Sequence, residues 1–176
     1  MKTFADQQNN PEVVAQNHEK FLNHLDGSIE TMWICARYLY NQGYAVKINP
    51  MKKAKTHGEW REYMDKGDLE IWVEGSPKRI EVKGLSTDFV NKEDWKFPDF
   101  IICAAHSWDM ANPKPLAYMI FNKKRTHVAI VYGKDSSTWT KDKKYDRRYT
   151  EIAQEFYFSP LEKVVWKPIK EEDKNG

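Results

Sequence analysis

Residues 67–86 read GDLEIWVEGSPKRIEVKGLS, two alternating runs separated by a Gly-Ser-Pro-Lys segment at 75–78. Gly, Ser and Pro are the residues that punctuate a chain at turns, so this stretch predicts a β-hairpin. Side chains alternate across a strand, and parity therefore decides which residues share a face. The apolar residues of both strands fall on one shared face: Leu69, Ile71, Val73, Ile80 and Val82.

The other face of the predicted hairpin is charged, and it carries Asp68, Glu70, Glu81 and Lys83. With the turn centred at 76–77, Glu70 is expected opposite Lys83, and Asp68 lies on the diagonal within reach of long side chains. These four side chains are therefore expected to project together, away from the core.

Hydrolysis of a phosphodiester needs groups of this kind. Carboxylates hold Mg²⁺, which prefers hard oxygen ligands, and the bound cation lowers the pKa of a water molecule. A lysine beside the metal can orient that water and screen the phosphate. Asp68, Glu81 and Lys83, with the backbone carbonyl of Val82 as a further metal ligand, fit these roles. A plain solvated face is the alternative, because acidic-x-Lys triplets also occur at 94–96, 142–144 and 172–174.

The residues 67–71 (GDLEI) and 79–84 (RIEVKG) resemble the PD-(D/E)XK nuclease superfamily, which includes many restriction enzymes, recombination nucleases and junction resolvases. The resemblance covers roughly residues 28–105. It implies that Asp68 is the first acidic residue of the motif and that Glu81 and Lys83 are its acidic-x-lysine part. It also implies Glu30, on the preceding helix, as a further catalytic carboxylate and metal ligand. Gly67 stands where the family motif has proline.

The order of elements predicts one α/β domain over residues 1–176, with a central mixed β-sheet flanked by helices and a restriction-endonuclease-like core. We expect an N-terminal helix in 1–27, the core in 28–132 and a C-terminal extension in 133–176. Asp26-Gly27-Ser28 is expected to separate a first helix from a second at 29–42. The expected buried side of that second helix is Ile29, Met32, Trp33, Ala36, Leu39 and Tyr40.

Further segments complete this expectation. Strands are expected at 44–48, 99–105, 116–121 and 126–132. A short helix is expected near 150–156, and residues 171–176 are expected to form a frayed tail.

The charge balance neither announces nor excludes a nucleic-acid ligand, because 28 basic and 26 acidic residues leave a net charge of +2. Two basic clusters are candidate phosphate contacts, although each alone is also typical of a solvated loop: Lys52, Lys53, Lys55, Lys123, Lys124 and Arg125. The resemblance favours double-stranded DNA as the partner. A homodimer is a further expectation, since cutting both strands often calls for two active sites.

The expected function is therefore Mg²⁺-dependent hydrolysis of DNA, by an endonuclease in which Mn²⁺ can substitute. Two alternatives stay open: an inactive nucleic-acid-binding or interaction protein on the same scaffold, and a ribonuclease. No apolar run is long enough to span a bilayer, and the first ten residues lack the apolar core of a secretory signal. The two cysteines, Cys35 and Cys103, lie in apolar runs without a Cys-x-x-Cys pair, as reduced buried thiols would. A cytoplasmic protein without a membrane partner is expected.

Overall fold

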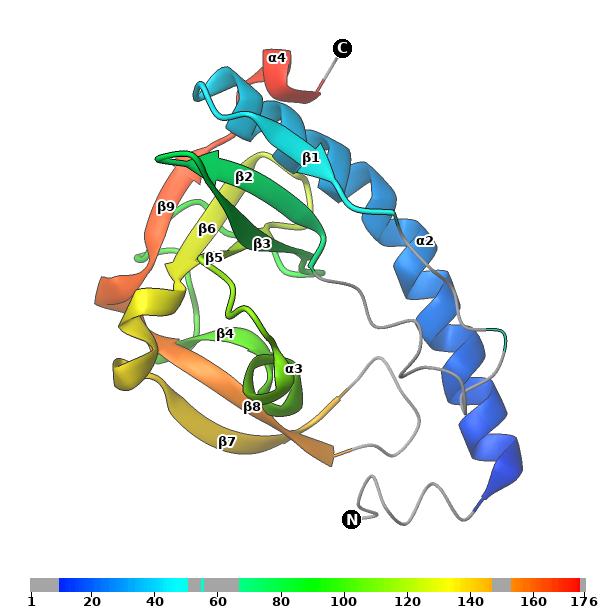
Figure 1. Cartoon of the computed structure of the whole chain (residues 1–176). Coiled ribbons are helices and arrows are strands. Elements are labelled where there is room, and N and C mark those ends of the chain that lie inside the picture. The colour runs from blue at the N-terminus through cyan, green and yellow to red at the C-terminus, as the bar shows by residue number, and fades with distance from the viewer. Residues whose placement is uncertain (1–9, 51–54, 56–66, 147–152, 175–176) are drawn as a thin grey trace.

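The computed structural model describes residues 10–50, 55, 67–146 and 153–174 (Figure 1). Within these ranges the helices are α2 (Pro11–Asn41), α3 (Ala105–Met110) and α4 (Glu171–Lys174), and the 3₁₀ turns are η2 (Gly133–Thr138) and η3 (Leu161–Lys163). The strands are β1 (Val46–Ile48), β2 (Leu69–Val73), β3 (Ser76–Gly84), β4 (Asp99–Ala104), β5 (Ala117–Phe121), β6 (His127–Tyr132), β7 (Thr140–Tyr145), β8 (Ala153–Pro160) and β9 (Val165–Pro168).

Two sheets organise the described chain. The larger has the strand order β1-β2-β3-β5-β6-β9, and the smaller has the order β4-β8-β7. Strands β3 and β5 run parallel, whereas all other neighbours are antiparallel. A parallel pair requires a crossover connection, and here the crossover passes through β4 and α3. The mixed sheet of an α/β fold is thus confirmed.

The large sheet has a different cover on each face (Figure 1). Helix α2 packs on one face over an aliphatic core that includes Leu39, Leu69 and Ile80. The smaller sheet and α3 cover the other face over an aromatic core that includes Phe89 and Tyr118. The expectation of a sheet flanked by helices is therefore met on the α2 face only, because the second face is covered mainly by strands.

The short helix expected near 150–156 is wrong for the part that the structure describes, since β8 begins at Ala153. This segment continues into Phe156, Tyr157 and Phe158, and aromatic side chains suit a pleated, half-buried surface better than a helix. β8 lies between β4 and β7, and it thereby builds the smaller sheet.

Helix α2 is continuous over 31 residues, so the break expected at 26–28 is wrong. The Asn10 side chain caps its start by accepting from the backbone N–H groups of Glu12 and Val13, at 3.2 and 3.5 Å. Gly27 lies in the helix interior, at a cost of roughly 1 kcal/mol relative to alanine. Packing of the C-terminal half on the sheet outweighs that cost. Within the described residues, no helix is both long and apolar enough to cross a membrane.

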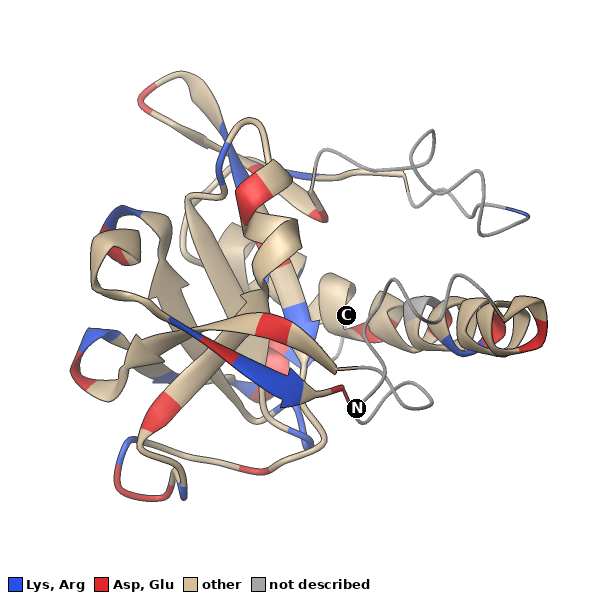
Figure 2. Cartoon of the chain, turned by 90° about the horizontal axis from the view of Figure 1, so that it is seen from below, with Lys and Arg blue, Asp and Glu red and all other residues tan. Residues whose placement is uncertain are grey.

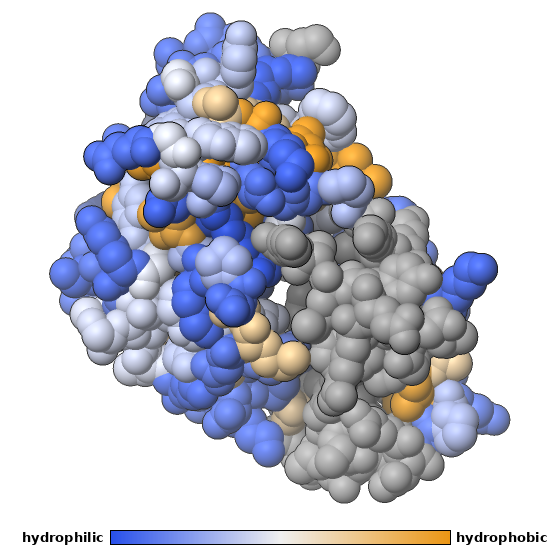
Figure 3. All heavy atoms as spheres, in the orientation of Figure 1, coloured by the Kyte–Doolittle hydropathy of each residue, from blue (hydrophilic) through white to orange (hydrophobic). Residues whose placement is uncertain are grey.

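The buried side of α2 is rotated from the expected one. Met32, Ala36 and Leu39 are buried as predicted, but Trp33 and Tyr40 are 59% and 70% exposed. Ile29 is likewise exposed, and Figure 3 shows a hydrophobic strip along the C-terminal half of α2, beside β1. The apolar stripe of the helix is wider than the surface that the sheet covers, so its outer edge stays in solvent.

The C-terminal segment is folded onto α2, so the frayed tail expected at 171–176 is wrong over Glu171–Lys174. Asp173 is 3% exposed, and its carboxylate accepts from Asn41 Nδ2 at 2.6 Å and from the Lys170 N–H at 3.0 Å. This docking brings Lys174 beside the long helix.

Candidate active site

The β2–β3 hairpin closes through a tighter turn than the sequence suggested. Val73 lies opposite Ser76, and the two residues between them, Glu74 and Gly75, have positive φ angles of 50° and 75°. Such two-residue turns match the right-handed twist of antiparallel strands. Glu70 consequently lies opposite Arg79 and not opposite Lys83, so the expected register was wrong.

The register error leaves the faces unchanged, because the offset between Lys83 and Arg79 is an even number of residues. Leu69 and Val82 lie in the aliphatic core against α2, as predicted. Glu81 and Lys83 lie on the opposite face, toward the aromatic core. Glu70 pairs with Lys47 of the neighbouring strand, at 3.4 Å, and so takes no part with Lys83.

Asp68 lies directly before β2, where β3 extends beyond the start of β2 and stays paired with β5 on its other side. Its Oδ2 accepts a hydrogen bond from the Val82 backbone N–H at 2.7 Å. The N–H and C=O of one strand residue point to the same edge, so the Val82 carbonyl is directed to the side on which Asp68 lies. Asp68 is thereby held beside the backbone of Glu81, which immediately precedes Val82.

Arg79 orients Glu81. Its Nε donates to Glu81 Oε1 at 2.6 Å, and the two side chains are only 12% and 18% exposed. The Arg79 side chain crosses Gly67, where an added Cβ would come 2.5 Å from Arg79 Cγ. Gly67 also has φ +103°, a conformation that glycine adopts at little cost. Glycine at this position therefore gives Arg79 its path to Glu81.

Lys83 reaches toward the aromatic core. Its Nζ lies 5.6 Å from the centroid of the Tyr118 ring, which is 1% exposed. Burial raises the pKa of the Tyr118 hydroxyl far above its usual range, and a hydrogen bond joins this hydroxyl to Cys103. Burial likewise raises the pKa of the Cys103 thiol, and the Lys83 charge opposes that shift. Both cysteines are buried and free, as expected.

The structure does not bring the three predicted carboxylates into one group. Among the described residues, no three His, Cys, Asp or Glu side chains lie close enough together to hold a metal ion. Glu30 projects from α2 into a pocket of basic residues. The Asp68 carboxylate reaches the backbone of Val82, the residue between Glu81 and Lys83, and both carboxylates and the Val82 carbonyl are hard oxygen donors. That chemistry suits Mg²⁺, which binds through one or two carboxylates and keeps several waters.

The predicted basic contacts divide into two sets. Lys52 and Lys53 lie outside the described residues, and Lys55 is exposed. The second set, Lys123, Lys124 and Arg125, forms the turn between β5 and β6. Figure 2 shows basic and acidic residues interspersed along the ribbon, as the near-zero net charge suggests.

Arg125 is the best-fixed member of that second set. It adopts a positive φ of 57°, and its Nε donates to Thr31 Oγ1 at 2.8 Å. Its Nη1 donates to the backbone carbonyls of Asn122 and Lys123 at 2.5 and 3.2 Å. The guanidinium lies against Gly84, where an added Cβ would come 2.4 Å from Nη2. Arg125 therefore adjoins the end of β3 directly after Lys83.

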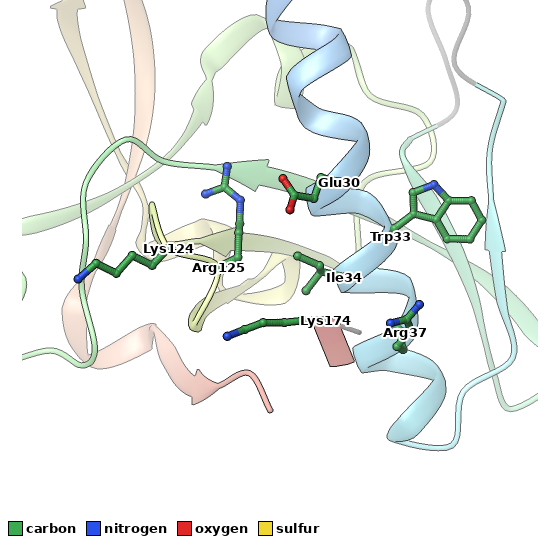
Figure 4. A pocket seen from close by; sticks show the side chains of 7 residues that line it. All are labelled: Glu30, Trp33, Ile34, Arg37, Lys124, Arg125 and Lys174. Atoms are coloured by element: carbon green, nitrogen blue, oxygen red, sulfur yellow. The ribbon is translucent and has the colours of Figure 1, made fainter. Parts of the chain in front are cut away.

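A pocket of about 390 Å³ lies between α2 and this turn (Figure 4). Its lining is Glu30, Trp33, Ile34, Arg37, Lys124, Arg125 and Lys174. Arg37 and Lys174 were not among the predicted residues. The spacing of Glu30 and Arg37, two helical turns apart, could have placed Arg37 on the same helix side. No local pattern could have placed Lys174 there.

Comparison of the chain with protein-family models, curated proteins and solved structures found no match.

Proposed function

We propose that this chain is a Mg²⁺-dependent deoxyribonuclease, acting as an endonuclease through Asp68, Glu81 and Lys83 on a restriction-endonuclease-like core. The observation that carries the proposal is the hydrogen bond from the Val82 N–H to Asp68. It joins the residue before β2 to the acidic-x-lysine segment of β3, the two parts of the motif on the two strands of the hairpin.

A divalent cation would be held by Asp68, Glu81 and the Val82 carbonyl, and it would supply a water of lowered pKa and neutralise charge on the scissile phosphate. Arg79 occupies one oxygen of Glu81 and fixes the direction of the carboxylate. Each carboxylate has a second oxygen as a further acceptor. Glu30 keeps its place in the proposal as a further metal ligand, supported by the order of elements alone.

Lys83 is proposed to position the attacking water and to donate to a phosphate oxygen. A lysine ammonium has three donors on a flexible stem, which suits contact with a phosphate whose orientation changes during reaction. The face of Tyr118 attracts the ammonium and limits its range.

Nicking of supercoiled plasmid in Mg²⁺ or Mn²⁺ tests this function. The wild type is expected to nick, and Asp68→Ala and Lys83→Ala are expected to abolish nicking. Lys47→Ala is the matched control for Lys83, because it removes an exposed lysine that pairs with Glu70. Cleavage that survives both site substitutions would contradict the proposal. A single-stranded RNA substrate in the same series tests the ribonuclease alternative.

A second function, metal-independent nucleic-acid binding without cleavage, is favoured by two observations. Glu81 is engaged by Arg79, and no three-acid group exists among the described residues. This alternative predicts no nicking under any metal and unchanged DNA binding in EDTA.

The proposal further includes a homodimer, which brings two active sites to the two strands of a duplex, and a cytoplasmic location, where DNA is the substrate. Sedimentation of the protein with and without duplex DNA tests the dimer. A monomer both with and without DNA would contradict the proposed homodimer.

A further inference from the structure

The pocket beside α2 holds positive charge that its surroundings do not neutralise. Arg37 and Arg125 both line it, and among the described residues neither guanidinium pairs with a carboxylate. Lys124 has a long ion pair with Asp88, at 3.9 Å, and Lys174 pairs with Glu171 at 2.7 Å. Glu30 is the single acidic residue of the lining (Figure 4).

Arg37 adds a second, independent observation. Its Nη1 is buried and has no hydrogen-bond partner within the described part of the chain. A buried donor without an acceptor carries a desolvation cost, and such groups in native proteins call for an explanation. The charge of this guanidinium is therefore balanced by no acceptor at Nη1 in the described part of the chain.

Arg125 approaches the same pocket from the β5–β6 turn, already held in place by Thr31 and by two backbone carbonyls. These three acceptors are all neutral, so the charge of the guanidinium remains. A planar guanidinium presents paired donors that match the oxygens of a phosphate. Arg37 and Arg125, with Lys124 and Lys174, therefore give the lining of this pocket four basic side chains whose donors suit the oxygens of a phosphate.

We propose that this pocket binds a phosphate group. The assignment rests on the proposed nuclease function, in which the group is a backbone phosphate of the DNA strand, near the scissile one. Arg125 connects the two places, because its guanidinium lies against Gly84, the residue after Lys83. Lys83 itself points to the aromatic face of the sheet, so in this proposal the strand passes around the end of β3 to reach the pocket on the α2 face.

Binding of a labelled DNA duplex, followed by fluorescence anisotropy in EDTA, tests the pocket without any cleavage. Calorimetry with inorganic phosphate as the second probe separates a free anion from a strand. The test variant is Arg37→Gln, which removes no hydrogen bond of Nη1 and is expected to leave thermal unfolding unchanged. Lys163→Gln is the matched control, because Lys163 precedes β9 at the end opposite to α4. Arg37→Lys keeps the charge and removes the planar donor pair.

Arg37→Gln is expected to weaken duplex binding about tenfold at low salt and to lower the slope of log affinity against log salt by about 1. Lys163→Gln is expected to leave both unchanged, and Arg37→Lys is expected to keep the slope. Loss of phosphate binding with unchanged duplex binding would show that the pocket binds a free anion. It would overturn the proposal that the bound phosphate belongs to a DNA strand.

If Arg37→Gln matches the control with both probes, the pocket is not a phosphate site. That result would not affect the nicking test, because nicking depends on Asp68 and Lys83. Absence of nicking by the wild type, together with the expected effect of Arg37→Gln on duplex binding, would overturn the proposed nuclease function and leave the phosphate pocket.

Discussion

The two faces of the large sheet handle charge in opposite ways. On the aromatic face, Glu81 is paired with Arg79, and at the start of β2 Asp68 accepts from the Val82 N–H. On the helix face, the guanidiniums of Arg37 and Arg125 have no carboxylate partner among the described residues. A charged side chain with a partner of opposite charge is held in one orientation, whereas a charged side chain without one can attract a ligand of opposite charge. The first arrangement suits the chemistry of a reaction, and the second suits the holding of an anion.

The largest expected effect is a difference in nicking rate between substitutions of Glu81 and of Glu70, one acidic residue on each strand of the hairpin. Glu81→Gln is expected to lower plasmid nicking by roughly 100- to 1,000-fold, because it removes a proposed metal ligand. Glu70→Gln is the matched control, since Glu70 carries the same charge on the same hairpin but pairs with exposed Lys47. Initial nicking rates in Mg²⁺ measure both. Equal rates for the two variants would show that the aromatic face has no catalytic carboxylate.

The next effect concerns the packing that holds Glu81. Gly67→Ala is expected to destabilise the fold by roughly 2–3 kcal/mol, because φ is +103° and the new Cβ meets Arg79. Gly43→Ala is the matched control, with φ +92° but no atom within 4 Å of the added Cβ. Denaturant unfolding compares the two variants. The loss of unfolding free energy beyond that of Gly43→Ala measures the clash between the added Cβ and the Arg79 side chain. Equal losses for the two variants would show that this clash costs nothing.

Local patterns predicted the features of this molecule that depend on neighbours in sequence. The period-two alternation of Leu69, Ile71 and Val73 fixed the buried face of the hairpin, and a wrong turn position shifted the register by an even step. The segment 75–78 holds the residues typical of turns, but the hairpin closes at Glu74-Gly75, where both residues have positive φ angles.

Features that depend on contacts between residues distant in the sequence could not be predicted from local patterns. The strand character of Phe156 is settled by its neighbours β4 and β7, and the order of α4 is settled by the bond from Asn41 to Asp173. The basic pocket has the same origin. It joins Arg37, Arg125 and Lys174, which the sequence separates widely and only the fold assembles.

A smaller effect tests the continuity of α2, which presents Glu30 and Arg37 to the pocket. Gly27 lies inside the helix, and an added Cβ would meet nothing within 4 Å. Gly27→Ala is therefore expected to stabilise the protein by roughly 0.5–1 kcal/mol, the difference in helix propensity. Thermal and denaturant unfolding measure this gain. Destabilisation would contradict a continuous helix through residues 26–28.

The smallest expected effect tests whether Glu30 acts in the basic pocket or as a metal ligand of the hairpin site. As a member of the basic pocket, Glu30 repels an anion, so Glu30→Gln is expected to tighten duplex binding in EDTA about two- to fivefold. As a metal ligand with Asp68 and Glu81, the same residue would leave that metal-free binding unchanged, and its substitution would lower nicking by roughly 100-fold. Anisotropy without metal and nicking with Mg²⁺ therefore give opposite patterns for the two roles. Tighter binding with near-normal nicking would assign Glu30 to the phosphate pocket and leave the hairpin site with two carboxylates.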